Sequence, residues 1–126
     1  MERYAIICDI DGTLAKHDPE VRSPYEWDKV GLDKPKQDIV FLLSSVLSGN
    51  PFKDGVRILL FTGRKKSCYK QTADWLQEHG VHYNDIFMRE EDDNRSDVDV
   101  KREMYKRHVE GRFKVWFVLD DRDRVS

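Results

Sequence analysis

Four short apolar runs, each followed by polar residues, constrain the fold of this chain more than any other feature. The runs are Tyr4–Ile10, Val56–Phe61, Asp85–Met88 and Val115–Leu119. Their length is typical of strands, and the continuous apolar character of the second run favours a parallel strand covered on both faces. Amphipathic segments at about 36–48, 67–79 and 97–108 separate the runs and predict helices. This alternation predicts an α/β fold with a central parallel sheet and helices on both faces.

Each predicted helix has one apolar face that we expect to pack on the sheet. The faces comprise Ile39, Leu42, Leu43, Val46 and Leu47 in the first helix, Tyr69, Thr72, Ala73 and Leu76 in the second, and Met104, Tyr105 and His108 in the third. Trp75 falls outside the apolar face of its helix, and Trp27 lies in the irregular segment 12–34, so either could stack on a nucleic-acid base. Trp116, inside the last apolar run, is expected in the core.

Size and charge exclude several classes of protein. A length of 126 residues predicts a single domain spanning residues 1–126. Lys and Arg total 22 and Asp and Glu total 24, and the net charge of -2 argues against a protein that coats nucleic acid through bulk positive charge. No apolar run approaches the roughly 20 residues that span a bilayer, and the N-terminus lacks a secretory pattern. Cys8 and Cys68 form neither a disulfide scaffold nor a zinc site, which favours a reducing, cytoplasmic location.

Polar clusters follow the apolar runs, at the points where the predicted strands end. They are Asp9 with Asp11, Thr62-Gly63-Arg64, Arg89, and Asp120-Asp121. In an open α/β sheet ligands bind beyond the carboxyl ends of the strands, so these side chains should gather at one rim. Packed carboxylates repel one another unless a cation neutralises them, and oxygen ligands from Asp9, Asp120 and Asp121 suit Mg²⁺. Carboxylates, Mg²⁺, a lysine and arginines together can bind a phosphate and stabilise its transfer.

The segment Asp9-Ile10-Asp11-Gly12-Thr13 resembles the first motif of the haloacid dehalogenase (HAD) superfamily, a DxDGT sequence at a strand end. The further motifs of that superfamily are matched in order by Thr62, Lys101 and Asp120-Asp121. The resemblance implies a Rossmann-like HAD fold. Beyond its core elements, neither the segment from Asp11 to Val56 nor that from Thr62 to Lys101 is long enough for a large cap domain. An uncapped site is open to a polymer end, which favours a macromolecular substrate.

A narrower resemblance covers most of the chain, from Tyr4 to Val125. The segments that carry it are Arg22-Ser23-Pro24-Tyr25, Thr62-Gly63-Arg64 with Tyr69, Thr72 and Trp75-Leu76, Met88-Arg89, Asn94-Arg95-Ser96-Asp97, Val100-Lys101 and Leu119-Asp120-Asp121-Arg122. They are similar to the phosphatase domain of phage-type polynucleotide kinase-phosphatases. The phosphate loop GxxxxGK[ST] of a kinase is missing from the sequence given. The resemblance implies a phosphatase that removes 3′-phosphates from DNA or RNA ends during nucleic-acid repair.

The resemblance also implies a role for each matched residue. Asp9 is the nucleophile that takes the phosphoryl group, Asp11 is the general acid and base, and Lys101 steadies the phosphoaspartate. The residues implied to hold Mg²⁺ are Asp9, Asp11 through its carbonyl, Asp120 and Asp121. The residues implied to bind or support the substrate are Arg22, Thr62, Gly63, Arg64 and Asp97. For Asp97 two roles stay open, in the shell of the metal or in orienting Lys101.

Structural interpretations compete with several of these roles. Thr62 could cap the following helix, Lys101 could be a solvated helix residue, and Arg22 could form a loop salt bridge. The basic residues Arg64-Lys65-Lys66 and Lys70 could be either a solvated helix start or a contact to a phosphate backbone.

The chain stops five residues after Asp121, so we expect a homodimer or a further C-terminal element to cover the edge formed by the last strand. The sequence therefore predicts a Mg²⁺-dependent phosphatase that acts on 3′-phosphorylated nucleic-acid ends and has no membrane partner. The alternatives are a HAD phosphatase of mononucleotides or other small molecules and, in a different class, a non-catalytic HAD-like binding module.

Overall fold

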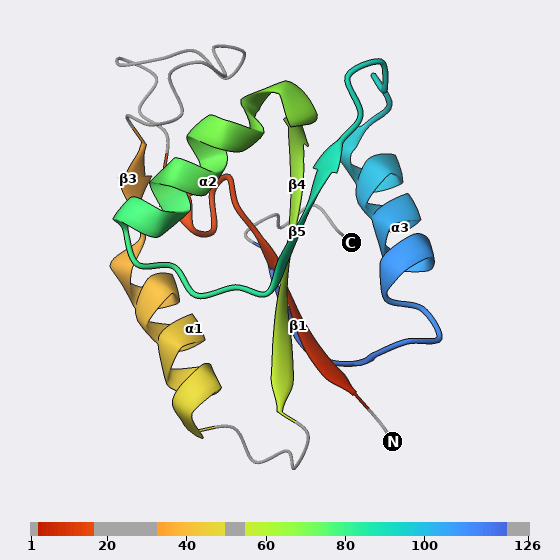
Figure 1. Ribbon diagram of the computed structural model, residues 1–126. Helices are drawn as coiled ribbons and strands as arrows, with labels where there is room; N and C mark the ends of the chain where they lie inside the picture. Colours follow the sequence, from red (N-terminus) through yellow and green to blue (C-terminus); the bar gives the residue numbers. More distant parts are fainter. Residues whose placement is uncertain (1–2, 17–32, 50–54, 121–126) are drawn as a thin grey trace.

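The computed structural model describes residues 3–16, 33–49 and 55–120 (Figure 1). Its main sheet has the strand order β5-β4-β1-β6, and every pairing in it is parallel. The strands of this sheet are β1 (Tyr4–Asp9), β4 (Val56–Lys65), β5 (Asp85–Arg89) and β6 (Lys114–Leu119). The predicted α/β architecture is confirmed. Two short strands, β2 (Ala15–Lys16) and β3 (Lys34–Pro35), form a small antiparallel pair that the sequence did not predict.

The helices cover both faces of the sheet, as expected (Figure 1). They are α1 (Gln37–Gly49), α2 (Tyr69–Glu78), which the short 3-10 helix η2 (Lys66–Cys68) precedes, and α3 (Asp97–His108). Successive residues of a strand point to opposite faces, so β1 supplies two cores. Ile6 and Cys8 belong to the core cluster that includes residues of α1 and α2, whereas Ala5 and Ile7 pack with Val100 of α3.

The strand register brings the ends of three strands to one rim of the sheet. Asp9, the last residue of β1, lies opposite Phe61 of β4, and Cys8 lies opposite Leu119 of β6. Thr62 and Asp120 follow these partners directly in the chain. The rim predicted from the polar clusters is therefore formed.

Strand β4 is longer than predicted. It continues through Lys65, so Thr62, Gly63 and Arg64 lie inside the strand and not in a turn after it. The pairing with β5 is irregular between Phe61 and Lys65 and resumes at Lys65, which lies opposite Arg89. The motif Thr62-Gly63-Arg64 therefore lies in an extended segment that is paired with β5 at both ends.

Several predicted core positions are wrong. Leu42 and Tyr69 are 36% and 50% exposed, while Val40 and Trp75 are buried. The burial of Trp75 excludes it as a base-stacking platform in this structure. Trp75 lies three residues after Thr72 and next to Leu76, on the buried face of α2. Trp116 is 39% exposed because β6 is the last strand of the described sheet and its alternate side chains lie outside the packed core. A partner or further element over this edge stays a prediction.

Within the described ranges, the helices are all too short or too polar to cross a membrane.

Candidate active site

The turn after β1 holds the two aspartates of the first motif at the rim. Gly12 has φ +87°, a conformation that side-chain-bearing residues avoid. The N–H of Leu14 donates to the carbonyl of Ile10 at 2.9 Å, and Lys36 Nζ donates to the carbonyl of Gly12 at 3.2 Å. These bonds fix the turn through its backbone, so its conformation depends little on any ligand.

An ion pair joins β1 to α3 at the centre of the rim. Lys101 Nζ donates to Asp9 Oδ1 at 2.6 Å and lies 3.8 Å from Asp120 Oδ2. The side chain of Asp9 is 7% exposed and that of Lys101 is 13% exposed, which excludes the interpretation of Lys101 as a solvated helix residue. The structure therefore brings together the first, third and fourth motifs, although they are far apart in the sequence.

Burial and charge shift the acidity of the groups around Asp9. Burial raises the pKa of Asp9 to about 6; the positive charge of Lys101 opposes this rise, and the carboxylates of Asp120 and Asp11 add to it. A cation at the rim would favour the ionised carboxylate. Burial also raises the pKa of the neighbouring Cys8 thiol to about 12, so Cys8 is no nucleophile at neutral pH.

The carboxylates at the rim fit Mg²⁺ in their chemistry. Asp9 and Asp120 share the ammonium group of Lys101 and offer only oxygen donors, the ligands that Mg²⁺ prefers. No group of three acidic, histidine or cysteine residues is close enough to hold a metal within the part of the chain that the structure describes. The expected ligand Asp121 lies outside the described residues. Backbone carbonyls, waters and substrate oxygens normally complete such sites.

Arg64 is fully buried, and two nitrogens of its guanidinium contact the two oxygens of the Asp11 carboxylate. Its Nε lies 3.1 Å from Asp11 Oδ2, and its Nη2 lies 2.8 Å from Asp11 Oδ1. Its Nη1 donates to Thr72 Oγ1 at 3.0 Å, and its Nη2 also lies 3.4 Å from Asp33 Oδ2. The carboxylate of Asp33 is buried, and the carbonyl of Asp33 accepts a bond of 2.9 Å from Trp75 Nε1. This bond gives the buried indole N–H of Trp75 a hydrogen-bond acceptor inside the core.

Thr62 does not cap the following helix. Its buried hydroxyl accepts a bond of 3.0 Å from the backbone N–H of Arg64, and the first helical segment begins only at Lys66. The helix-cap interpretation of Thr62 is therefore wrong, whereas its role toward a phosphate stays a prediction.

Asp97 packs against the backbone of β4 and forms an ion pair with Arg89 of β5. Arg89 Nε also donates to the carbonyl of Gly63 at 2.8 Å, so one guanidinium ties β5, β4 and the start of α3 together. A Cβ atom on Gly63 would lie 2.8 Å from Asp97 Cγ and 2.9 Å from Asp97 Oδ2, which is closer than packed atoms approach. Alanine at position 63 therefore fits only if the carboxylate of Asp97 moves away from β4. Both roles expected for Asp97, in the shell of the metal or in orienting Lys101, stay predictions.

We expect Gly63→Ala to destabilise the fold by about 1–3 kcal/mol, the usual cost of adding a methyl group to a filled space. It should also weaken the ion pair between Asp97 and Arg89, because the carboxylate of Asp97 must move away from β4. Urea unfolding measures the first effect. The matched control is Gly49→Ala, because nothing lies within 4 Å of a Cβ at Gly49. Equal stability of Gly63→Ala and Gly49→Ala would contradict the packing described here.

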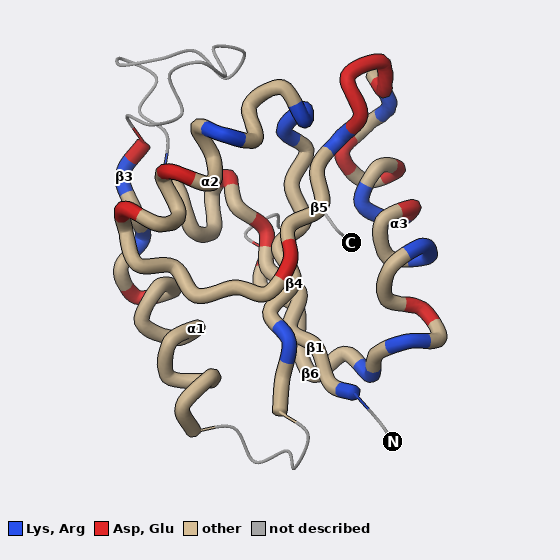
Figure 2. The backbone as a smooth tube through the Cα atoms, in the orientation of Figure 1, with Lys and Arg blue, Asp and Glu red and all other residues tan. Residues whose placement is uncertain are grey.

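The basic residues at the end of β4 are paired with acceptors. Lys65 Nζ donates to Asn94 at 2.9 Å, Lys66 forms an ion pair with Glu90, and Lys70 forms one with Asp74. Figure 2 shows this positive segment beside the acidic loop that follows β5. The pairing favours the structural interpretation of these lysines over a contact to a phosphate backbone.

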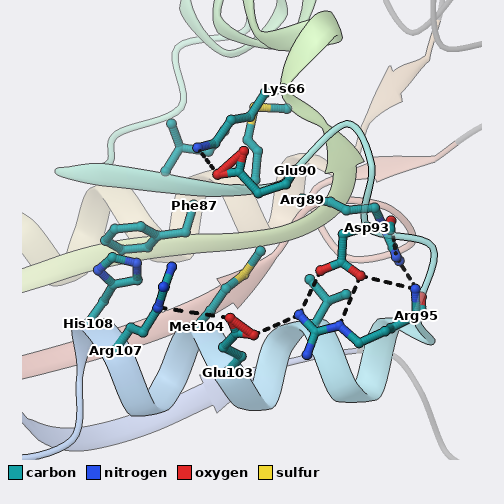
Figure 3. A pocket seen from close by; sticks show the side chains of 13 residues that line it. Lys66, Phe87, Arg89, Glu90, Asp93, Arg95, Glu103, Met104, Arg107 and His108 are labelled. Atoms are coloured by element: carbon teal, nitrogen blue, oxygen red, sulfur yellow. Dashed lines mark hydrogen bonds and ion pairs between the residues drawn. The ribbon is translucent and has the colours of Figure 1, made fainter.

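A separate pocket of about 270 Å³ lies between β5 and α3 (Figure 3). Its charged residues are largely paired with one another, as with Arg95, which contacts both Asp93 and Glu103. The rings of Phe87 and His108 stack at 4.1 Å and fill its other side. Asp9, Asp11 and Lys101 do not line it. The pocket is therefore distinct from the rim where the carboxylates gather.

Some expected residues cannot be placed, and others were missed. Arg22 and Trp27 lie outside the described residues. Sequence patterns did not single out Asp33 or Lys36, which belong to no motif or periodic face. Thr72 was predicted to be buried, but its bond to Arg64 was not foreseen.

Comparison with known proteins identifies the family to which this arrangement belongs. Residues 3–126 match the model of the "Polynucleotide kinase PNKP phosphatase domain" family. A protein of Autographa californica nuclear polyhedrosis virus, whose description names a polynucleotide kinase and an RNA ligase, is 29% identical over 123 residues. The match covers 96% of this chain and 17% of that protein.

Solved structures agree with this match. A chain in the structure of the Pnkp1/Rnl/Hen1 RNA repair complex superposes with a TM-score of 0.86 and 28% identity, over 97% of this chain and 37% of that one. A Class C acid phosphatase from Bacillus anthracis shares the fold, with a TM-score of 0.61 and 18% identity, over 94% of this chain and 52% of that one. The chain thus spans only 17% of the viral protein and 37% of the matching chain in the RNA repair complex. With a match along nearly its whole length, it belongs to the phosphatase-domain family of polynucleotide kinase-phosphatases, within the HAD-like fold.

Proposed function

We propose that this protein is a Mg²⁺-dependent phosphatase that removes the 3′-phosphate from polynucleotide ends through an aspartyl-phosphate on Asp9. The observation that carries the proposal is the buried Asp9 carboxylate at the rim, held at 2.6 Å by Lys101 with Asp120 beside the same ammonium group. A carboxylate that is desolvated but held in place by a lysine suits nucleophilic attack.

The residues divide the reaction into two steps. Since Asp9 Oδ1 accepts the bond from Lys101, Asp9 Oδ2 attacks the phosphorus, and the bond from phosphorus to the 3′ oxygen breaks. Asp11 gives its proton to the leaving 3′ oxygen. Water then attacks the phosphorus of the aspartyl-phosphate and gives a proton to Asp11. The bond from phosphorus to the Asp9 oxygen breaks, so that phosphate is released and the Asp9 carboxylate is restored. Lys101 offsets the negative charge throughout, and Thr62 provides a hydroxyl for the phosphate oxygens.

Mg²⁺ would be held by Asp9, the carbonyl of Asp11, Asp120 and Asp121. When bound, it neutralises charge on the phosphate oxygens and thereby favours their approach to Asp9.

The segment between Thr62 and Lys101 supports a polymer as the substrate. Between Thr62 and Lys101 the described chain is occupied by η2, α2, β5 and the first turn of α3, which leaves no segment for a cap. Relatives described as polynucleotide kinases and as parts of an RNA repair complex point in the same direction. We propose nucleic-acid ends as the substrate class on these grounds.

Phosphate release from a 3′-phosphorylated oligonucleotide, compared with release from a nucleoside 3′-monophosphate, tests the proposal. We expect kcat/KM for the oligonucleotide to be at least about tenfold higher, the factor that 1.4 kcal/mol of additional binding gives. EDTA should abolish both activities, and added Mg²⁺ should restore them. A mononucleotide that reacts equally well would favour the small-molecule phosphatase. No turnover of any phosphate ester would favour the binding module.

A further inference from the structure

We propose that Thr72 and Asp33 are positioning residues that act through Arg64 to fix the carboxylate of Asp11. The inference rests on the proposed function, because it assigns a purpose to contacts around the residue that would move the proton. It also changes the role expected for Arg64, from binding the substrate to orienting Asp11.

The guanidinium of Arg64 has every nitrogen engaged. Nε and Nη2 contact the two oxygens of Asp11, Nη1 donates to Thr72, and Nη2 also approaches Asp33. A planar guanidinium that meets a carboxylate through two nitrogens fixes the plane of that carboxylate as well as its position. Because Arg64 is fully buried, its guanidinium could turn toward a substrate phosphate only by giving up its bonds to Thr72 and Asp33, which are also buried.

The burial of these groups makes the arrangement rigid. Arg64 and Thr72 are fully buried, and the side chain of Asp33 is 1% exposed. The bond from Trp75 Nε1 to the carbonyl of Asp33 fixes that residue to α2, the helix that also carries Thr72. By contrast, the side chain of Asp11 is 37% exposed. The carboxylate of Asp11 is therefore accessible from solvent, whereas the residues that hold it are buried.

Proton transfer depends strongly on such positioning. A group that gives or takes a proton must lie within about 3 Å of its partner, and a misplacement of about 1 Å can cost on the order of a hundredfold in rate. Without the bond from Arg64 to Thr72, the guanidinium could rotate about its side-chain bonds and move the carboxylate of Asp11 with it. We expect the substrate to bind as before, because Arg64, Thr72 and Asp33 are buried.

Replacement of Thr72 tests the inference. We expect Thr72→Val, which removes the hydroxyl, to lower kcat for p-nitrophenyl phosphate by roughly ten- to a hundredfold with little change in KM. Thr72→Ser, which keeps the hydroxyl, should recover most of the loss. Gln77→Ala, at an exposed position of the same helix, is the matched control and should behave as the wild type. An unchanged kcat in Thr72→Val would overturn the inference.

An Asp11→Asn background separates positioning from a general loss of structure. The residual activity of Asp11→Asn is measured on p-nitrophenyl phosphate. Its leaving group needs little protonation in the first step, but the second step still needs Asp11 as the base that takes a proton from the attacking water. If Thr72 acts through Asp11, Thr72→Val has no further effect in this background. If Thr72 only supports the fold, it lowers activity by the same factor in both backgrounds, and the inference is wrong.

A measurement without turnover keeps the inference distinct from the proposed function. We expect Thr72→Val to shift the ¹³Cγ NMR signal of Asp11 and Gln77→Ala to leave it in place. A shifted signal in a protein without phosphatase activity would support the positioning network and refute the proposed function. An unshifted signal in a protein with phosphatase activity would refute the positioning network and support the proposed function.

Discussion

Replacement of Asp9 by Asn is expected to lower kcat on a 3′-phosphorylated oligonucleotide by at least about 10³-fold, since removal of a covalent nucleophile commonly costs this much or more. Asn has nearly the same shape but cannot form an acyl-phosphate. Its amide also provides one oxygen where the carboxylate provides two, so it cannot accept the bond from Lys101 and coordinate a cation equally well.

The control for Asp9→Asn is to show that the variant keeps the wild-type fold. The variant loses the ion pair with Lys101. The carboxylate of Asp9 is buried, however, so a neutral side chain of the same size removes a desolvation cost, and Asp120 remains 3.8 Å from the ammonium group. We therefore expect the variant to retain the circular dichroism spectrum and a melting temperature near that of the wild type. An inactive variant that is also unfolded would not test the nucleophile. In that case Asp9→Glu, which displaces the carboxylate by one methylene, takes its place and should also be inactive.

Arg64→Met is expected to lower the free energy of unfolding by about 3–5 kcal/mol, the usual cost of removing one member of a buried ion pair. The substitution removes the guanidinium that neutralises the buried carboxylate of Asp33, together with the bonds to Asp11 and Thr72. Since domains of this kind are stable by only about 5–15 kcal/mol, this is a large part of the total. The midpoint of urea unfolding measures the effect.

A second substitution identifies the cause of the destabilisation by Arg64→Met. Asp33→Asn, added to Arg64→Met, should recover part of the lost stability, because the buried group is then neutral. Lys70→Ala serves as the surface control: its ion pair with Asp74 is exposed, so its loss should leave the midpoint of urea unfolding close to that of the wild type. If Arg64→Met and Lys70→Ala had similar effects, the buried network would contribute little to stability.

The order of the elements could be predicted because the four strands of the main sheet are compact apolar runs separated by helix-length amphipathic segments. Polar residues after these runs predicted the ends of β1, β5 and β6 to within one residue, whereas β4 continues past its predicted end at Phe61. The structure places Asp9, Asp120 and Lys101 together as the HAD resemblance implies. What linked Lys101 to Asp9 in advance was the motif, because a lysine on a helix gives no such signal by periodicity.

Two physical features account for the errors at Trp75 and Trp116: a long-range polar bond and the edge of the sheet. Trp75 belongs to the buried face of α2 together with Thr72 and Leu76. The burial of its polar indole N–H is possible because the carbonyl of Asp33, 42 positions away, accepts its bond, a partner that helical periodicity does not reveal. Trp116 is partly exposed because β6 is an edge strand, and an apolar run reads the same at an edge as in the centre of a sheet. Asp33 was missed because a single acid before a helix is usually solvated.

The most direct test of the central claim is to trap the phosphoryl group on the enzyme. Rapid acid quenching of the wild type during turnover of a 3′-phosphorylated oligonucleotide with Mg²⁺, followed by borohydride, reduces an aspartyl-phosphate to homoserine. The peptide from residue 4 to residue 16 is then sequenced by mass spectrometry. We predict homoserine at position 9, dependent on the oligonucleotide and on Mg²⁺. Full turnover without homoserine at position 9, or with the modification at another residue, would contradict the assignment of Asp9 as the nucleophile.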